Sequence, residues 1–384
     1  MKRFLLSAFF LSIVSIQTFS FAEESNEKVI KSNRIDNYEI LSISQPGSLF
    51  YSVTNGIIKS AINLNSNLTF IGRANVGLEK VIDINNVEKL TTRENYLYSL
   101  SIKTIHNDVS DLFYSKKVSE SLINNEIIIS DLTANLYSLV KGDSLFLIGL
   151  NQQEVEVVVG EIIPDSEIGW FEGVVNKDLG YKLGINRNIQ AIIWGNKITE
   201  NHLIEIHRNI KYEKIKLTGR NSIPNRNWVL PTALVKEMFG DFQIKERDGT
   251  WITIDRAWKD ENIETKNVPI LGRITCHRLM WEPLLGAFNQ IIEENLQSGL
   301  SREQYQEAGG CYAPRRINRF DSGGSISRHA WGIAIDINTK TGYKPRIVEI
   351  FNDWGFAWGG TWTSPDAMHF ELRSLSASIS QANK

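Results

Sequence analysis

Two segments in the C-terminal half of the chain combine histidines with carboxylates at short spacing. The segment SRHAWGIAIDIN contains His329 and Asp336, and DAMHFEL contains Asp366 and His369. Two histidines and one carboxylate are the protein ligands of an open catalytic zinc site, in which a water molecule takes the fourth position. These residue types therefore predict a Zn2+ site made of His329, Asp336 and His369, with Asp366 as a spare acid.

The chemistry of such a site needs an acid–base group and a cation beside the metal. Zinc lowers the pKa of a bound water towards about 7, and a nearby carboxylate can then accept the water's proton and pass it to a leaving amine. Asp366 is expected to fill that role. A cation would stabilise a developing oxyanion or bind a substrate carboxylate, and the segment YAPRRINRF offers Arg315 and Arg316.

The residues around Asp336 predict a strand that presents its carboxylate. From residue 333 to residue 338, three isoleucines alternate with small or polar residues, so one strand face is apolar and the other carries Asp336. Gly332 would let the backbone turn or approach a ligand closely before the strand begins. Ser327 has no separate base to activate it, so we predict a turn or capping residue there and not a nucleophile.

A second predicted strand carries His369. His369 and Glu371 share one face of this strand, opposite Phe370. Glu371 would either accept a hydrogen bond from the ligand histidine or lie at the surface at the strand end. Four tryptophans nearby would form either a sugar-stacking floor or core and pocket wall: Trp331, Trp354, Trp358 and Trp362.

Three sequence blocks of this region follow one another in a definite order. They are Ser327-x-His329-x-x-Gly332-x-Ala334-x-Asp336, then Trp358-Gly359-Gly360-x-Trp362, then Asp366-x-x-His369-Phe370-Glu371. Over residues 271–372, about a quarter of the chain, this order resembles the M15 family of zinc D,D-/L,D-peptidases, which cut peptidoglycan stem peptides. The family includes D-alanyl-D-alanine carboxypeptidases and L-alanyl-D-glutamate endopeptidases.

The resemblance implies a role for each candidate site residue. His329, Asp336 and His369 would be the zinc ligands, and Asp366 would be the catalytic base. Arg315 best matches the arginine of the family's upstream block, with Arg316 as its rival. An aspartate at position 366 is more like the endopeptidase branch, while the sequence leaves carboxypeptidase and endopeptidase action both open.

The resemblance also implies a fold for residues 221–384. We expect an α+β domain of the hedgehog/D-Ala-D-Ala peptidase-like type, in which a small antiparallel sheet carries the ligands and helices pack to one side. Because the hedgehog signalling domain shares this fold, the competing hypothesis is a cell-wall- or partner-binding protein with a vestigial zinc site. Asp366 argues against it, since a pure binder has no use for a base beside the metal.

Residues 1–22 have the composition of a bacterial export signal. A basic start precedes an apolar run from Phe4 to about Ile16, and Ser20 and Ala22 have the small-residue spacing that a signal peptidase reads. An uncleaved anchor is the alternative, but the run is shorter than the roughly 20 residues that span a bilayer. We therefore expect a mature protein without a membrane span, located in the periplasm or in the cell wall or extracellular space.

The remaining sequence predicts the organisation of the chain more than its chemistry. Residues 23–37 read as a polar leader and residues 38–220 as a β-rich region, and the 384 residues suffice for two or more domains. The net charge of -2 and the lack of lysine or arginine runs give no case for nucleic acid. The expected partners are peptidoglycan peptides, and the oligomeric state is not indicated.

Three local features of the C-terminal region can also be predicted. A hairpin is expected around Asp248-Gly249. Cys276 and Cys311 would either pair, which is worth about 3–4 kcal/mol, or remain buried thiols. An amphipathic helix is expected to open near Pro283, with one apolar stripe formed by Leu285, Phe288, Ile292 and Leu296.

Overall fold

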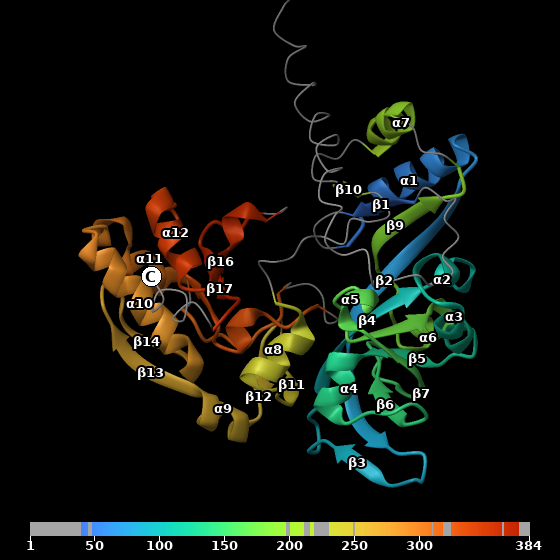
Figure 1. Cartoon of the computed structure of the whole chain (residues 1–384), viewed down its shortest axis with the longest axis horizontal. Coiled ribbons are helices and arrows are strands. Elements are labelled where there is room, and N and C mark those ends of the chain that lie inside the picture. Colours follow the sequence, from blue (N-terminus) through green and yellow to red (C-terminus); the bar gives the residue numbers. More distant parts are fainter. Residues whose placement is uncertain are drawn as a thin grey trace, which may run out of the picture. The chain divides into compact units, whose positions relative to one another are not determined.

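The computed structural model describes residues 40–44, 48–196, 200–210, 216–218, 230–248, 250–308, 310–317, 324–362 and 365–375 (Figure 1). The expected export signal at 1–22, the leader at 23–37 and the start of the second domain at 221–229 lie outside these ranges. All described residues belong to one compact unit, Asn37–Lys384. Within them, no helix is long and apolar enough to cross a membrane.

The first half of the described chain is built on a ten-stranded sheet, as expected for a β-rich region. The strand order is β10-β1-β9-β2-β4-β8-β5-β7-β6, and β3 pairs with β2. The strands are β1 Leu41–Ser44, β2 Asn67–Ile82, β3 Glu88–Thr91, β4 Tyr98–Ile105, β5 Ile127–Ser130, β6 Ser144–Ile148, β7 Glu154–Ile163, β8 Gly173–Asn176, β9 Asn188–Trp194 and β10 Lys216–Thr218.

The pairing in this sheet is mixed. Most pairs are antiparallel, while β4 with β8 and β5 with β7 are parallel. The short strands β5 and β8 are buried along their whole length, which explains their continuous apolar runs III and VV. The helices of this half are α1 Tyr51–Asn63, α2 Asn107–Phe113, α3 Lys116–Ile123, α4 Asp131–Tyr137, α5 Asp165–Ile168, α6 Lys177–Lys182 and α7 Glu200–Ile210.

The C-terminal part mixes helices with small antiparallel sheets. The predicted hairpin is present, because β11 Ile244–Glu246 pairs antiparallel with β12 Ile252–Ile254. A second pair joins β13 Ile263–Val268 to β14 Gly272–His277. The helices are α8 Thr232–Phe239, α9 Arg256–Asn262, α10 Trp281–Glu293, α11 Arg302–Ala308 and α12 Pro345–Asp353, with the 3-10 turns η2 Arg278–Met280, η3 Gln297–Gly299, η4 Arg328–Ala330 and η5 Gly359–Thr361.

A three-stranded antiparallel sheet forms the centre of this part. Its order is β15 Ala334–Asp336, β17 His369–Leu372 and β16 Phe356–Trp358. The helix α12 lies beside these strands (Figure 1), and its Phe351 ring stacks on Phe370 of β17 at a centroid distance of 4.3 Å. Ile335 is fully buried in the same core. The expected small antiparallel sheet with a helix packed on it is therefore present.

The predicted apolar stripe of the long amphipathic helix was correct at Phe288 and wrong at Ile292. The helix α10 begins at Trp281, and Ile292, expected inside, is 41% exposed. The apolar residues of this segment cover an arc wide enough for two neighbouring stripes, so periodicity alone could not choose between them. The buried face of α10 contains Trp281, Pro283, Leu284, Ala287, Phe288 and Ile291.

The two cysteines form a disulfide. Cys276 on β14 pairs with Cys311, and their Cα atoms are 5.4 Å apart. Both residues are buried in the C-terminal core. The bond ties β14 to the chain segment that leads towards the 3-10 turn η4, and it decides the alternative that the sequence left open.

A buried ion pair connects α8 with the first half of the chain. The Nζ of Lys236 lies 2.8 Å from Glu172 Oε1 and 3.5 Å from Asp241 Oδ2, and its side chain is 1% exposed. The same ammonium donates hydrogen bonds to the Ser99 carbonyl oxygen and the Tyr137 hydroxyl oxygen. Because each charge is buried, each depends on the others for stabilisation.

Candidate metal centre

Three neighbouring elements carry the predicted ligands. His329 stands on the 3-10 turn η4, Asp336 on β15 and His369 on β17. In the antiparallel pair of β15 and β17, Asp336 lies directly opposite His369. Ser327 begins η4 as its N-cap, and its hydroxyl oxygen accepts a hydrogen bond from the His329 backbone N–H at 3.3 Å. The predicted capping role of Ser327 is therefore confirmed.

The three side chains converge on one point. His329 Nε2 lies 3.2 Å from Asp336 Oδ2, and His369 Nδ1 lies 2.9 Å from Asp336 Oδ1. The two ring nitrogens are 3.3 Å apart. All three residues are buried, and in the described ranges they form the only group of three or more His, Cys, Asp or Glu residues able to hold a metal ion together.

Outer hydrogen bonds determine which nitrogen of each imidazole faces inward. His329 Nδ1 lies 2.9 Å from the carbonyl oxygen of Cys311, which can only accept, so Nδ1 carries the hydrogen and Nε2 keeps its lone pair. His369 Nε2 lies 3.1 Å from Glu371 Oε2, and its Nδ1 faces Asp336. Glu371 is thus a buried partner of His369 and not a surface carboxylate.

The electrostatics of the cluster favour a positive charge at its centre. Burial alone would lower the pKa of His369, but hydrogen bonds to Asp336 and Glu371 raise it to about 9. Burial would raise the pKa of Asp336, yet the hydrogen bonds and positive charges of the two imidazoles in their protonated form hold it well below its usual range. Burial would also raise the pKa of Glu371, but the hydrogen bond from His369 and the charges of Arg328 and the two histidines together lower it.

These donors fit a zinc ion. Two imidazole nitrogens with inward lone pairs and one carboxylate oxygen are a zinc ligand set, and each imidazole is oriented by a hydrogen bond from its other nitrogen. Without a metal ion or a proton between them, the lone pairs of His329 Nε2 and His369 Nδ1 would repel each other across 3.3 Å. His329, Asp336 and His369 could therefore hold a metal ion.

Asp366 lies beside the three ligands and is not one of the group. Its backbone N–H donates to the Gly359 carbonyl oxygen at 3.0 Å, and its own carbonyl oxygen accepts from the His369 N–H at 3.2 Å. Burial raises the pKa of the Asp366 carboxyl above its usual range, against the opposing charges of His369, His329 and Arg315. The carboxyl is thus within electrostatic reach of the cluster.

The two candidate arginines differ in what they bind. Arg316 is buried, and its guanidinium contacts the Glu246 carboxylate and donates to the Gly324 carbonyl oxygen at 2.6 Å. Arg315 is half-buried, and among the described residues its side chain has no hydrogen-bond or ion-pair partner. The charge of Arg315 also acts on Asp366. This arrangement favours Arg315 as the cation that meets a ligand.

Two features of the site were not predicted from the sequence. The orienting group of His329 is the main-chain carbonyl of Cys311, which no side-chain pattern could reveal. Tyr343 donates its hydroxyl hydrogen to main-chain oxygens of Ile337 and Met368, residues adjacent to two ligands. Trp362, predicted as floor or wall, packs against His369 with ring centroids 5.1 Å apart.

Part of the chain matches a known protein family. Residues 321–372 match an M15 peptidase family model described as D-alanyl-D-alanine carboxypeptidase. The matched segment lies in the C-terminal part and contains His329, Asp336, Asp366 and His369, so it confirms the resemblance stated from the sequence blocks. A search of curated proteins finds no match to the chain.

Proposed function

We propose that the chain is an exported zinc metallopeptidase that hydrolyses peptide bonds in peptidoglycan stem peptides. The observation that carries this proposal is the convergence of His329, Asp336 and His369 within the segment that matches a cell-wall peptidase family. The family match supports a peptidase, and the donor set supports zinc. Residues 1–22 supply the proposed export signal, and the periplasm or cell wall is the proposed location.

The proposed roles follow from the positions of the side chains. A bound zinc ion supplies Lewis acidity and lowers the pKa of a water molecule to about 7. Asp366 accepts the proton of the attacking water and then gives it to the leaving amine, and a raised pKa suits a carboxyl that must act as acid as well as base. Arg315 binds a substrate carboxylate or the developing oxyanion. The hedgehog/D-Ala-D-Ala peptidase-like fold belongs to the same proposal.

Metal analysis combined with mass spectrometry of muropeptide products tests this function. The purified protein should contain zinc and release peptide fragments whose masses identify the cleaved bond, which also separates carboxypeptidase from endopeptidase action. The His329→Ala variant should lose both zinc and hydrolysis. A protein that sediments with sacculi, releases no fragments and behaves the same after His329→Ala would instead be a wall-binding protein with a vestigial site.

A further inference from the structure

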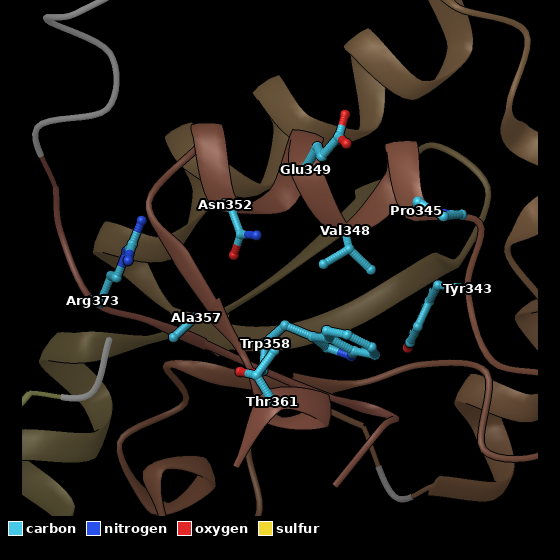
Figure 2. Close-up of a pocket in the computed structure, with 9 residues that line it drawn as sticks. All are labelled: Tyr343, Pro345, Val348, Glu349, Asn352, Ala357, Trp358, Thr361 and Arg373. Atoms are coloured by element: carbon cyan, nitrogen blue, oxygen red, sulfur yellow. The ribbon is translucent and has the colours of Figure 1, made fainter. Parts of the chain in front are cut away.

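A groove of about 540 Å3 lies between α12 and the segment of β16 and η5 (Figure 2). None of the three candidate metal ligands lines it. A volume of this size accommodates a small organic ligand, and such sites commonly join an apolar floor to a few polar groups. The lining residues are Tyr343, Pro345, Val348, Glu349, Asn352, Ala357, Trp358, Thr361 and Arg373.

The Trp358 indole forms a fixed platform in this groove. Its Nε1–H donates to the Ala367 carbonyl oxygen at 2.9 Å. Gly360 lies against the ring, since a Cβ at that position would come within 2.2 Å of the indole. The Tyr343 ring stands at 88° to the indole with centroids 6.4 Å apart. The indole is therefore held in place by the protein, with Tyr343 and Val348 beside it (Figure 2).

Two polar side chains at the groove have unused hydrogen-bonding groups. Asn352 and Arg373 lie together on one side of it (Figure 2), and within the described part of the chain neither side chain has a hydrogen-bond or ion-pair partner. Glu349 differs, because its carboxylate accepts from the Arg346 guanidinium at 3.2 Å. The groove thus presents an aromatic floor, an amide and a guanidinium, while the Glu349 carboxylate is paired with Arg346.

The groove shares a wall with the candidate metal centre. The wall is the segment from Trp358 to Thr361, whose Gly359 carbonyl oxygen accepts from the Asp366 N–H. A Cβ on Gly359 would also approach the Cβ of His369 at 3.3 Å, so the two segments are in close contact. One extended ligand could therefore occupy the groove with one end and reach the metal centre with the other.

We propose that this groove binds a sugar residue of the glycan strand that carries the stem peptide. The proposal rests on the proposed peptidase function and extends it from the peptide to the polysaccharide. The apolar C–H face of a sugar ring stacks on the Trp358 indole because the face of an aromatic ring is electrically negative. Sugar hydroxyl and acetamido oxygens accept hydrogen bonds from Asn352 and Arg373. The Trp358 indole favours a sugar ring over a free carboxylate, which has no apolar face to stack on it.

Binding of peptide-free glycan strands, measured by calorimetric titration, tests the inference. The variants Arg373→Ala and Asn352→Ala should each bind such strands about tenfold more weakly than the wild type, the expected loss for a hydrogen bond from a charged or amide group to a ligand. Arg273→Ala is the matched control, because Arg273 is an exposed arginine on β14 that does not line the groove. Thermal unfolding checks that each variant is folded.

The outcomes separate the groove from the peptidase. Glycan binding that is unchanged in both groove variants, or a wild type that binds free stem peptide and not glycan, would overturn the assignment. Since peptide-free strands contain no bond to hydrolyse, the result does not depend on catalysis. If the protein binds glycan through Arg373 and Asn352 but cleaves no muropeptide, the assignment of the groove stands and the proposed peptidase function is refuted.

Discussion

His369 Nε2 lies 3.1 Å from Glu371 Oε2, and both side chains come from the same face of β17. The strand thus supplies the candidate ligand and, two residues later, the carboxylate that orients it. Because Glu371 is buried, water screens its negative charge little. The charge makes the imidazole more basic, and Nδ1 becomes a stronger ligand for a metal ion. Both residues come from the short motif HFEL, so a single strand supplies both the metal-ligating histidine and the carboxylate that binds its other nitrogen.

Replacing Glu371 by Gln should therefore weaken zinc binding about 10–100-fold, the range observed when the carboxylate behind a ligand histidine is lost. The amide can still accept a hydrogen bond from Nε2, but it no longer carries the charge that favours a cation. Competition with a chromophoric chelator measures the zinc affinity. Glu282→Gln changes an exposed carboxylate in the first turn of α10 and should leave the affinity unchanged. Equal affinities in both variants would contradict the assigned role of Glu371.

The Asp366→Asn variant should keep its zinc and lose most of its hydrolysis. A general base contributes about 10²–10⁴-fold to turnover, and the asparagine amide cannot accept the proton. Zinc content and muropeptide turnover are measured on the same preparation. The control is Asp248→Asn, an exposed aspartate in the turn of the β11–β12 hairpin. If the Asp366 variant loses zinc, Asp366 is a ligand, and the division into three ligands and one base is wrong.

Two local features of this site could be predicted correctly, because each depends on residues close together in the sequence. Alternation along a strand correctly placed Glu371 beside His369, and a serine before a turn was correctly read as a cap. The carbonyl of Cys311 could not be predicted, because every residue has one and only the folded chain brings it to His329. The stripe of α10 was wrong at Ile292 for a related reason, since which side of a wide apolar arc is buried depends on the elements packed against it.

The ten-stranded sheet shows the same limit on a larger scale. Short apolar runs between turn signals predicted a β-rich region, but the neighbours of each strand are distant in sequence. The strand β2, for example, pairs with β9 along its first residues and with β4 and β6 further on. Such pairings depend on long-range packing, and a one-dimensional pattern of apolar residues does not encode them.

His277 should make the protein less stable as the pH falls from about 6.5 to about 4. Burial lowers the pKa of this imidazole to about 4, while its pKa in the unfolded chain is near 6.5. Between these values the unfolded chain binds a proton that the folded protein does not, so the free energy of unfolding decreases as the pH falls. The full loss is about 3 kcal/mol, and no further loss from this residue is expected below pH 4.

Denaturant unfolding at several pH values, with wild type and His277→Gln compared, isolates this contribution from that of the other titrating groups. In the folded protein, His277 Nδ1 accepts from the Leu279 N–H at 3.1 Å, and Nε2 lies 3.2 Å from the Phe239 carbonyl oxygen. Glutamine can offer one donor and one acceptor but does not titrate. The wild type should therefore show the steeper dependence on pH in this window. Parallel curves for the two proteins would refute the assignment.

Lys236→Met should destabilise the protein by about 3–5 kcal/mol, the usual effect of removing one partner from a buried ion pair. Methionine fills a similar volume, so the lost stability comes mainly from the carboxylates of Glu172 and Asp241, which stay buried without their cation. Denaturant unfolding measures it, and Lys259→Met on the exposed side of α9 is the matched control. If the two variants differ by less than about 1 kcal/mol, water or another group compensates the buried charges.

A double-mutant cycle with Glu172→Gln separates the ion pair from simple packing. Lys236→Met leaves Glu172 and Asp241 without a cation, and Glu172→Gln leaves Lys236 with Asp241 alone. The double variant removes both members of the Lys236–Glu172 pair at once and leaves only Asp241 unpaired. The two destabilisations should therefore not add, and the double variant should be more stable than their sum predicts by at least about 1 kcal/mol. Additive effects would mean that Lys236 and Glu172 stabilise the fold independently, and that the 2.8 Å contact between them contributes little.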